Sequence, residues 1–558
     1  MTRSVIAIGL DAANPEVLDR WMNRGLLPNM ARLRKQGGFG KLTSAIKHNR
    51  AEVPWPVFLT GCLSNKTGYW TPIKYHSDKY TCDDPKYHEG AYDFKKYPPF
   101  YAGLGKEHPV AVFDMPQTVM RDDVDGVQVL GWGGHARMTP SASNPAELYK
   151  QLVDKYGENP LLDKDSYAEA DRDDERRYRA GLEQGIPRKA DIVIDLLKQQ
   201  RWSLLLTVFG EAHSTHHYLW HRSQPHTVDW SEAAPSEDPM LRAFQLMDAA
   251  IGRIQEAAPE DATIVIFSVH GTRSNSGDLG ANVFLPEMMY RWNYPGSYAL
   301  GPGEPNDLPL PKPRMATQTA WWNEVWNLRY EPNKLKYLLR QRVPAKYFHK
   351  LRLERLSGPA NQSPLLYKPD LFWLPAYWYS NMWSKMRAFA LPAYSDGYIR
   401  INLKGRDANG IVDPKDYERT CDEITEMLYA IRDTRKGERL VEEVIRTRPN
   451  AEADGPEYSD ADLVVLFNER DCPADTVDHP TFGRIGPMPF NRTGGHYSTG
   501  FCIAKGPGIA ASSQITGDSI DITPTLLQLM GAPIPEYMDG HPLKMDAADQ
   551  ETQATAAE

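Results

Sequence analysis

Residues 4–37 read SVIAIGLDAANPEVLDRWMNRGLLPNMARLRKQG and decide the fold class. The run from Ser4 to Gly9 is short, apolar and rich in Val and Ile, which is typical of a strand buried in a parallel sheet. From Pro15 to Gln36 the apolar residues recur at helical spacing, until Gly37 and Gly38 end the pattern. A buried strand followed at once by a helix is the repeating unit of α/β proteins.

The same alternation returns along both ends of the chain. Further apolar runs predict buried strands at Val110–Phe113, Ser203–Phe209, Ala262–Phe267, Leu463–Phe467 and Phe501–Ala504. Helical spacing lies between many of them, for example from Leu241 to Glu256 and from Tyr417 to Arg432. Strands that alternate with helices predict an α/β fold whose mostly parallel sheet is covered by helices on both faces.

The pattern breaks between Leu285 and Leu391. This stretch holds seven of the 14 tryptophans, and the part from Arg329 to Arg355 carries nine Lys or Arg against two acids. We therefore predict an α/β core from residues 1–284 and 392–544, a basic, aromatic insertion or cap at 285–391, and a flexible tail at 545–558. A solvated helical subdomain, a lid, a dimer contact and an anion-steering surface all suit the insertion. The sequence does not indicate the oligomeric state.

Composition excludes several classes of protein. The 558 residues include 64 Lys and Arg against 73 Asp and Glu, a formal net charge of -9, so nucleic acid is not expected as the main partner. The longest apolar runs are far shorter than the roughly 20 residues of a membrane helix, and the first residues do not read as a secretory signal. Five scattered cysteines without CxxC spacing favour a reducing, cytoplasmic location.

Metal-binding residue types follow the predicted strands. Asp11 comes directly after the first strand, His213 and His217 lie just past Ser203–Phe209, and His270 follows Ala262–Phe267. His496 precedes the last apolar run. Because ligands of open α/β sheets bind outside the carboxyl ends of the strands, we expect these side chains to converge.

The spacing of His213 and His217 adds to this expectation. Residues four apart share one face of a helix, and two such histidines with a distant third make a zinc site that keeps an open position. Two alternatives stay open. The first places the histidines in a His-rich surface loop that also holds His216, His221 and His226. Asp11 would also suit a helix cap before Pro15.

Several segments resemble the alkaline phosphatase superfamily, and most closely its branch of nucleotide pyrophosphatases and type I phosphodiesterases. They are the opening IGLDAANPEVLDRWMNRGLLPNMARLRKQG and the later segments WPVFLTGCLSNKTGYW, FGEAHSTHHYLW, SVHG, GYIRINLKGRDANGIVDPKDYE, GGHYSTGFCIAKGPGI and SIDITPTLLQLMGAPIPEYMDG. The resemblance spans about Val5 to Leu543, interrupted by the aromatic insertion. It implies an alkaline phosphatase-like sheet.

The resemblance also implies the chemistry of the site. Family members bind two zinc-like ions that clamp a phosphate and activate a Thr or Ser nucleophile. Asp11, His217, His270 and His496 match family ligands, and His213 stands where an Asp is usual. Val269 stands where the second ion needs an Asp, and Ala51 stands at the nucleophile position.

These departures imply one ion, zinc or a similar divalent metal, at His213, His217 and His496, with only Asp11 and His270 left for a second. Arg50 and Glu52 flank Ala51, and we expect Arg50 to hold an anionic oxygen and Glu52 to act as a general acid or base. The alternative is that both are loop residues facing water. The nearest upstream hydroxyls are Thr43 and Ser44, whereas Glu211 and His135 are polar residues expected to line the cleft behind the ligands.

Three functional hypotheses follow. The first is a divergent phosphodiesterase-like enzyme that hydrolyses or transfers a phosphoryl or related ester of a small, anionic organic molecule. The second is a metal-poor pseudoenzyme or ligand-binding protein on the same scaffold, which Ala51 and Val269 favour. The third takes Ala51 as an introduced substitution that traps substrate, although this leaves Val269 and His213 unexplained.

Overall fold

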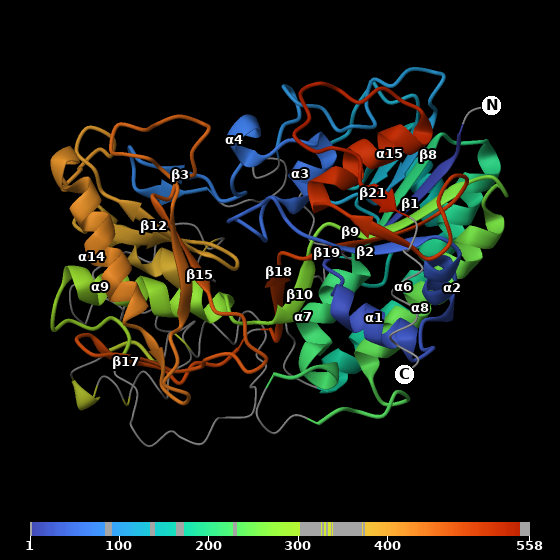
Figure 1. The fold of residues 1–558 in the computed structure, drawn as a ribbon. Helices are drawn as coiled ribbons and strands as arrows, with labels where there is room; N and C mark the ends of the chain where they lie inside the picture. Colours follow the sequence, from blue (N-terminus) through green and yellow to red (C-terminus); the bar gives the residue numbers. More distant parts are fainter. Residues whose placement is uncertain are drawn as a thin grey trace.

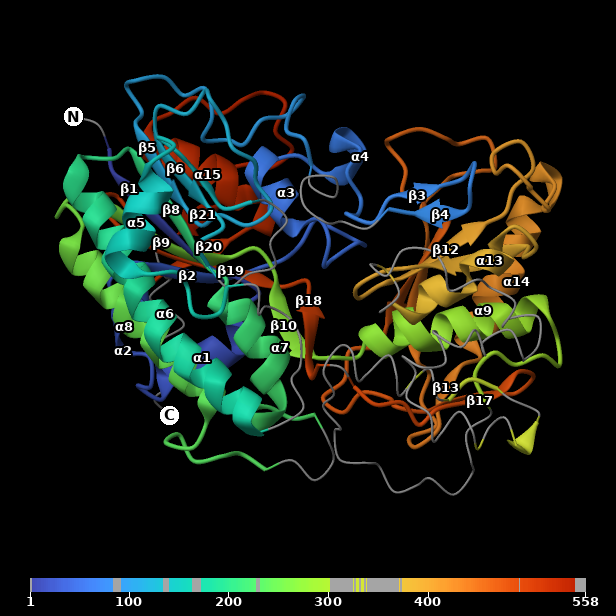
Figure 2. The ribbon, with the colours of Figure 1, turned by 180° about the vertical axis from the view of Figure 1, so that it is seen from behind.

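The computed structural model describes residues 3–83, 92–133, 140–162, 172–226, 231–301, 325, 328–330, 333–335, 338, 371, 374–490 and 492–546. Figure 1 shows two lobes side by side, one built around strand β1 and the other around strand β12. Figure 2 shows the same two lobes from behind, with β10 and β18 lying between them in both views. Among the described helices, none has the length and apolar character that a bilayer crossing requires.

A ten-stranded sheet forms the first lobe in the described part of the chain. Its order is β21-β20-β2-β19-β9-β1-β8-β5-β6-β7. The strands are β1 (Val5–Leu10), β2 (Gly38–Leu42), β5 (Val110–Phe113), β6 (Gly126–Leu130), β7 (Ala142–Asn144), β8 (Leu204–Phe209), β9 (Thr263–Ser268), β19 (Gly500–Lys505), β20 (Ser513–Thr516) and β21 (Lys544–Asp546). From β9 to β6 all pairings are parallel, whereas β7, β19 and β21 run against the others. The predicted mostly parallel α/β sheet is confirmed.

Helices cover both faces of this sheet. Successive side chains of a strand point to opposite faces. Ile6 and Ile8 of β1 accordingly belong to one buried cluster, and Val5 and Ala7 to another. The helices of the first cluster are α1 (Pro15–Asn23), α2 (Pro28–Gln36), α5 (Leu148–Tyr156), α6 (Arg172–Gln199), α7 (Glu211–Ser223) and α8 (Pro239–Ala257). Those of the second are α3 (Pro54–Thr60) and α15 (Ile522–Met530).

The helix predicted over Pro15–Gln36 is two helices. The first ends at Asn23, and Gly25 follows with a φ of 71°, a left-handed conformation that glycine adopts without strain. Pro28 then begins the second helix, because a proline without an N–H fits the first helical position. The apolar spacing runs through the break, since both helices pack on the same face of the sheet.

The second lobe has its own core. Its main sheet is antiparallel and consists of β11 (Ala388–Leu391), β12 (Gly397–Ile401), β15 (Leu463–Phe467) and β14 (Val441–Arg446), in that order. Leu463–Phe467 is therefore a strand as expected, but it belongs to this sheet and not to the parallel one. The helices include α9 (Leu285–Asn293), α13 (Ser380–Trp383) and α14 (Tyr417–Tyr429). The smaller elements are β3 (Tyr75–His76), β4 (Thr81–Cys82), β13 (Arg432–Asp433), β16 (Val477–His479) and β17 (Gly483–Ile485).

The two cores divide the chain differently from the predicted boundaries. The buried cluster of the second lobe reaches from Ile73 to Phe490 and includes residues 392–490, which the sequence assigned to the α/β core. The strands in this range belong to the antiparallel sheet of the second lobe. Their buried apolar side chains are therefore part of the core of that lobe. Most of residues 302–370 and all of 547–558 lie outside the described residues. An insertion and a flexible tail there stay predictions.

The chain passes between the lobes twice, beside a two-stranded antiparallel sheet. Strands β10 (Gly271–Ser274) and β18 (Gly494–Tyr497) pair antiparallel, with Thr272 opposite His496. After β10 the chain enters a π-helical turn, Gly280–Phe284, and continues into α9. The segment before β18 brings the chain back from β17. This two-stranded sheet therefore lies where the carboxyl edge of the parallel sheet is connected to the second lobe.

Candidate metal centre

Helix α7 presents two histidines from the carboxyl edge of the sheet. Strand β8 ends at Phe209, and α7 begins two residues later. His213 and His217 are one turn apart on this helix, and their Nε2 atoms lie 3.0 Å from each other. Both side chains are buried. The alternative of a His-rich surface loop is therefore wrong for this pair.

Strand β18 adds the third imidazole. The rings of His496 and His217 have centroids 5.0 Å apart, and those of His496 and His213 have centroids 5.1 Å apart. One ring nitrogen from each of the three histidines lies within 4.8 Å of the other two. The structure thus brings together the three residues that the sequence proposed for one ion.

Hydrogen bonding orients His217 toward this group. Its Nδ1 lies 2.7 Å from the carbonyl oxygen of Gly494. A carbonyl only accepts, so Nδ1 carries the proton and Nε2 carries the lone pair. Burial, together with the Arg492 guanidinium and the two other imidazoles, lowers the pKa of His217 well below its usual value. His217 is therefore neutral at neutral pH, which is the form that binds metals.

The described donor set fits a zinc-like ion. With Zn–N bonds of about 2.0–2.1 Å, nitrogens around a tetrahedral zinc lie roughly 3.3 Å apart. The 3.0 Å between the Nε2 atoms of His213 and His217 is close to this spacing. Three protein nitrogens leave a fourth position open, as in catalytic zinc sites. The carbonyl behind His217 is the kind of outer partner that fixes a ligand's tautomer.

Arg492 lies next to the histidines, and sequence reasoning missed it. Its Nη1 is 2.9 Å from Nε2 of His217. Its Nε and Nη2 donate to the two carboxylate oxygens of Asp278 at 2.6 and 3.1 Å. Both residues are at most a tenth exposed. Arg492 stands only four residues before His496, but no residue pattern connects it with Asp278, which lies on the other segment that passes between the lobes.

The second pair of expected ligands lies beside a tryptophan. Oδ1 of Asp11 is 3.8 Å from Nε2 of His270 and accepts a hydrogen bond of 3.0 Å from the Trp55 indole. Val269 is buried in an apolar cluster with Phe267. This position therefore offers one carboxylate, one imidazole and an apolar contact.

The capping role considered for Asp11 belongs to another residue. The side chain of Asn14 accepts a hydrogen bond from the backbone N–H of Val17, so Asn14 is the N-cap of α1. Asp11 is fully buried beside Trp55 and His270 instead. Its place at the end of β1 therefore puts its carboxylate beside His270 and away from the first turn of the helix.

The turn that carries Ala51 is tied to the second lobe. The backbone N–H and the guanidinium of Arg50 donate to Asp396, with Nη2 and Oδ1 2.9 Å apart. Nη1 of Arg50 lies 3.5 Å from Glu469. Glu52 accepts a hydrogen bond of 3.1 Å from the backbone N–H of Tyr394. All three contacts cross from the first lobe to the second.

Glu52 is an unusual carboxyl group. It is 1% exposed, and burial, with the nearby charge of Asp396, raises its pKa to about 7. Arg50 is 15% exposed at its side chain. The alternative in which both residues face water is therefore wrong.

The other polar candidates are held elsewhere. The Thr43 hydroxyl donates to Asp518, and the Ser44 hydroxyl oxygen accepts from the backbone N–H of Ile46. Glu211 is fully buried at the start of α7, where it accepts from Lys189 at 3.0 Å. His135 lies outside the described residues.

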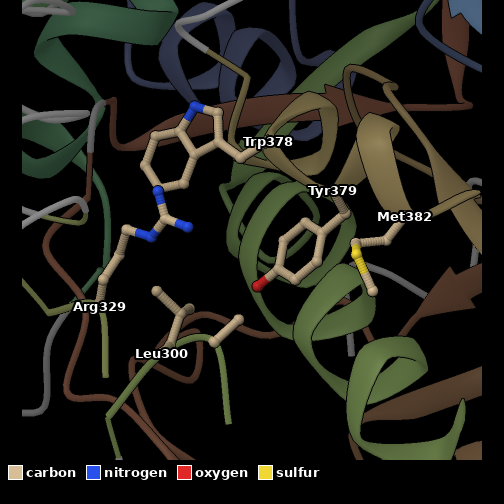
Figure 3. A pocket seen from close by; sticks show the side chains of 6 residues that line it. Leu300, Arg329, Trp378, Tyr379 and Met382 are labelled. Atoms are coloured by element: carbon tan, nitrogen blue, oxygen red, sulfur yellow. The ribbon is translucent and has the colours of Figure 1, made fainter. Parts of the chain in front are cut away.

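A cavity in the second lobe does not provide a second site within the described residues. Figure 3 shows Arg329 and Trp378 pointing toward one another across it, with Tyr379 and Met382 on the far wall. Its volume is about 10 Å³, roughly the space that one water molecule requires. The hydroxyl of Tyr379, which lines the cavity, donates to the buried carboxylate of Glu287 at 2.6 Å. This arrangement stabilises the lobe and has no room for a substrate.

Comparisons with known proteins found similar solved structures and one family model. Two structures of phosphonoacetate hydrolase from Sinorhizobium meliloti 1021, in complex with phosphonoformate and phosphonoacetate, align at 12% and 13% identity with a TM-score of 0.41. Each alignment covers 95% of this chain and 96% of the other. A search of curated proteins found no match.

The family model called type I phosphodiesterase / nucleotide pyrophosphatase matches residues 5–307, which is more than half of the 558 residues. The matched part contains β1, β8, α7 and β9, the elements that place Asp11, His213, His217 and His270. The chain therefore belongs to the type I phosphodiesterase and nucleotide pyrophosphatase family, a branch of the alkaline phosphatase superfamily.

Proposed function

We propose that this protein hydrolyses a phosphoryl or related ester of a small, anionic organic molecule with one divalent ion, zinc or similar, held by His213, His217 and His496. The observation that carries the proposal is the convergence of three imidazole nitrogens within 4.8 Å at the carboxyl edge of the sheet. Membership of a family of phosphoester hydrolases supports the reaction class.

The residues present define what each part would do. A divalent ion held there supplies Lewis-acid polarisation and activates water. The Gly494 carbonyl keeps His217 in the tautomer that directs Nε2 to the ion. Ala51 has no hydroxyl, so water takes the place of a covalent nucleophile and the ester is cleaved to an alcohol and a phosphate. Transfer to another hydroxyl acceptor follows the same route, with that acceptor replacing water.

The catalytic roles expected of Arg50 and Glu52 stay predictions. Their contacts with Asp396, Glu469 and Tyr394 support a different role, in which they fix the Ala51 turn against the second lobe. We also propose a reducing compartment such as the cytoplasm, because all five cysteines are free thiols.

A second candidate function is binding without turnover. The observation that favours it is the Arg492 N–H, 2.9 Å from the nitrogen of His217 that an ion would need. In this case the cleft would keep a small anion and no metal, and Ala51 and Val269 would reflect the loss of chemistry.

Activity with controlled metal distinguishes the two functions. The chelated protein and the zinc-reloaded protein are assayed on a panel of phosphodiesters, nucleotides and sulfate esters, beside His217→Ala. We expect turnover that needs zinc and that His217→Ala abolishes. Absence of turnover across the panel with zinc bound would favour binding alone. Activity in His217→Ala at the wild-type rate would contradict the proposed site.

A further inference from the structure

Arg492 is the cation built into the candidate metal centre. The Nε and Nη2 atoms of its guanidinium donate to the two carboxylate oxygens of Asp278. A bidentate pair of this kind fixes the plane of the guanidinium group. The remaining nitrogen, Nη1, points to Nε2 of His217 at 2.9 Å. The Arg492 and Asp278 side chains are 10% and 5% exposed, so both are shielded from bulk water.

The lone pair of His217 decides what Nη1 can bind. Nδ1 of His217 faces the Gly494 carbonyl, which leaves Nε2 with a single lone pair. The Arg492 N–H and Nε2 of His213, 3.0 Å away, both face that lone pair, and a metal ion bound there would take it from them. An ion on Nε2 therefore releases an N–H of Arg492 while Asp278 still holds the rest of the fork. The released donor would then be available to an anionic ligand of that ion.

We propose that Arg492 binds a non-bridging oxygen of the phosphoryl group held at His213, His217 and His496. This rests on the proposed function and adds a specificity-determining residue to it. Among the described residues, the second-ion position offers Asp11 and His270, with the Trp55 indole already on Asp11. From its place beside His217, a fixed guanidinium would supply part of the positive charge that a second ion would give. It favours anions with at least two acceptor oxygens, one for the ion and one for Arg492.

Other cations near the cleft are held differently. Arg273 lies 3.7 Å from the centroid of the Tyr497 ring and pairs with Glu469 at 3.2 Å. The Lys189 ammonium faces three acceptors, on Asp114, Glu211 and Val208. Of these three cations, Arg492 alone has a donor directed at a ring nitrogen of the histidine trio.

The test compares two affinities in the full-length protein. Zinc binding is measured by competition with a chromophoric chelator, and inorganic phosphate binding to the zinc-loaded protein by calorimetry. For Arg492→Met we expect phosphate to bind about tenfold or more weakly, because a charge-assisted hydrogen bond is lost. We expect zinc to bind severalfold more tightly, because a competing donor and a like charge are removed. A purely structural role would weaken both.

Arg435→Met is the matched control. Arg435 makes the same bidentate, buried pair with Asp475, at 2.7 and 2.8 Å, inside the second lobe. We expect this variant to bind zinc and phosphate as the wild type does. Arg492→Lys keeps the charge and loses the fork, so its phosphate affinity should fall between those of the wild type and Arg492→Met. It also carries the test if Arg492→Met does not fold.

Each outcome decides between the ideas. Equal phosphate affinity in wild type and Arg492 variants with zinc bound would overturn the role of Arg492 and leave the proposed function standing. If the wild type binds no zinc, the proposed function fails, and phosphate is titrated against the metal-free proteins. If the metal-free wild type binds phosphate and Arg492→Met does not, Arg492 is still supported as the anion ligand. Equal phosphate binding by the two proteins would overturn that role.

Discussion

Two single residues, Trp55 and Val269, limit metal binding at the second-ion position beside Asp11 and His270. The Trp55 indole donates to Asp11, and Val269 packs into an apolar cluster. Tight binding of a zinc-like ion usually takes three or more protein ligands. Within the described part of the chain Asp11 and His270 alone fall short of that number, so we expect no second ion to activate a hydroxyl at position 51.

Ala51→Thr tests this consequence. We expect the variant to hydrolyse phosphodiesters at a rate within about twofold of the wild type, because a hydroxyl without an activating ion or base is a weak nucleophile. The measurement is the steady-state rate on a nitrophenyl phosphodiester with zinc present. A gain of tenfold or more would show that Ala51 alone blocks a covalent route, and would favour the idea of an introduced substitution.

Glu52 gives the stability of the protein a pH dependence. Its pKa is about 7 in the folded state, against an ordinary value of 4.5, so the folded protein holds an extra proton between these values. Stability is therefore greatest at or below pH 4.5 for this group and falls as the pH rises through 7, by about 3 kcal/mol in all.

Denaturant unfolding at pH 5 and pH 8 measures this effect. Glu52→Gln mimics the protonated group, so we expect its free energy of unfolding to fall less over the same pH range. Exposed Glu443→Gln is the control and should follow the wild type. An unchanged pH dependence in Glu52→Gln would show that Glu52 titrates normally.

At the scale of elements, the first turn of α7 is fixed by a buried ion network. Lys189 of α6 is fully buried and lies 2.7 Å from Asp114, at the end of β5, and 3.0 Å from Glu211, the first residue of α7. Asn159 donates to the other oxygen of Glu211 at 3.1 Å. The helix that carries His213 and His217 is thus held at its start by groups from several elements.

Lys189→Met tests the network. Removing one partner of a buried ion pair costs about 3–5 kcal/mol, because the remaining charges stay buried. We expect a loss of this size in chemical denaturation, together with weaker zinc binding. Glu211→Gln added to Lys189→Met should restore part of the stability. If the double variant is less stable than the single one, the cost does not come from the buried carboxylate.

Elements with a strong local pattern were predictable from the sequence, and elements set by long-range packing were not. Val110–Phe113 is a strand with the expected bounds, because a short run of apolar residues is buried along its whole length when it forms a central strand. Leu463–Phe467 has the same pattern, but its partners decide the sheet. The histidine trio was predictable from strand ends and spacing. Arg492 with Asp278 was not, because their contact joins two segments 214 residues apart.

At the scale of the whole molecule, charges hold the two lobes together. Arg50 and Arg273 of the first lobe both contact Glu469 of the second, and Arg50 also pairs with Asp396. Asp396 is fully buried. The site lies beside this junction, since β10 and β18 carry Arg273 and His496 between the lobes (Figure 2).

Arg50→Met should loosen the junction. It leaves Asp396 buried without its main cationic partner, a change that costs about 3–5 kcal/mol. We expect calorimetry to show a lower melting temperature and a wider separation between the unfolding of the two lobes. Arg446→Met, which removes a more exposed pair inside the second lobe, is the control. A single unshifted transition in Arg50→Met would contradict a role for this contact in coupling the lobes.

The number of ions per chain tests the one-ion site most directly. The protein is saturated with zinc, freed of unbound metal by gel filtration and measured by elemental analysis, beside His496→Ala and Asp11→Asn. We expect about one zinc per chain in the wild type and in Asp11→Asn, and close to none in His496→Ala. Two ions per chain, or one ion that Asp11→Asn loses and His496→Ala keeps, would contradict a single centre at His213, His217 and His496.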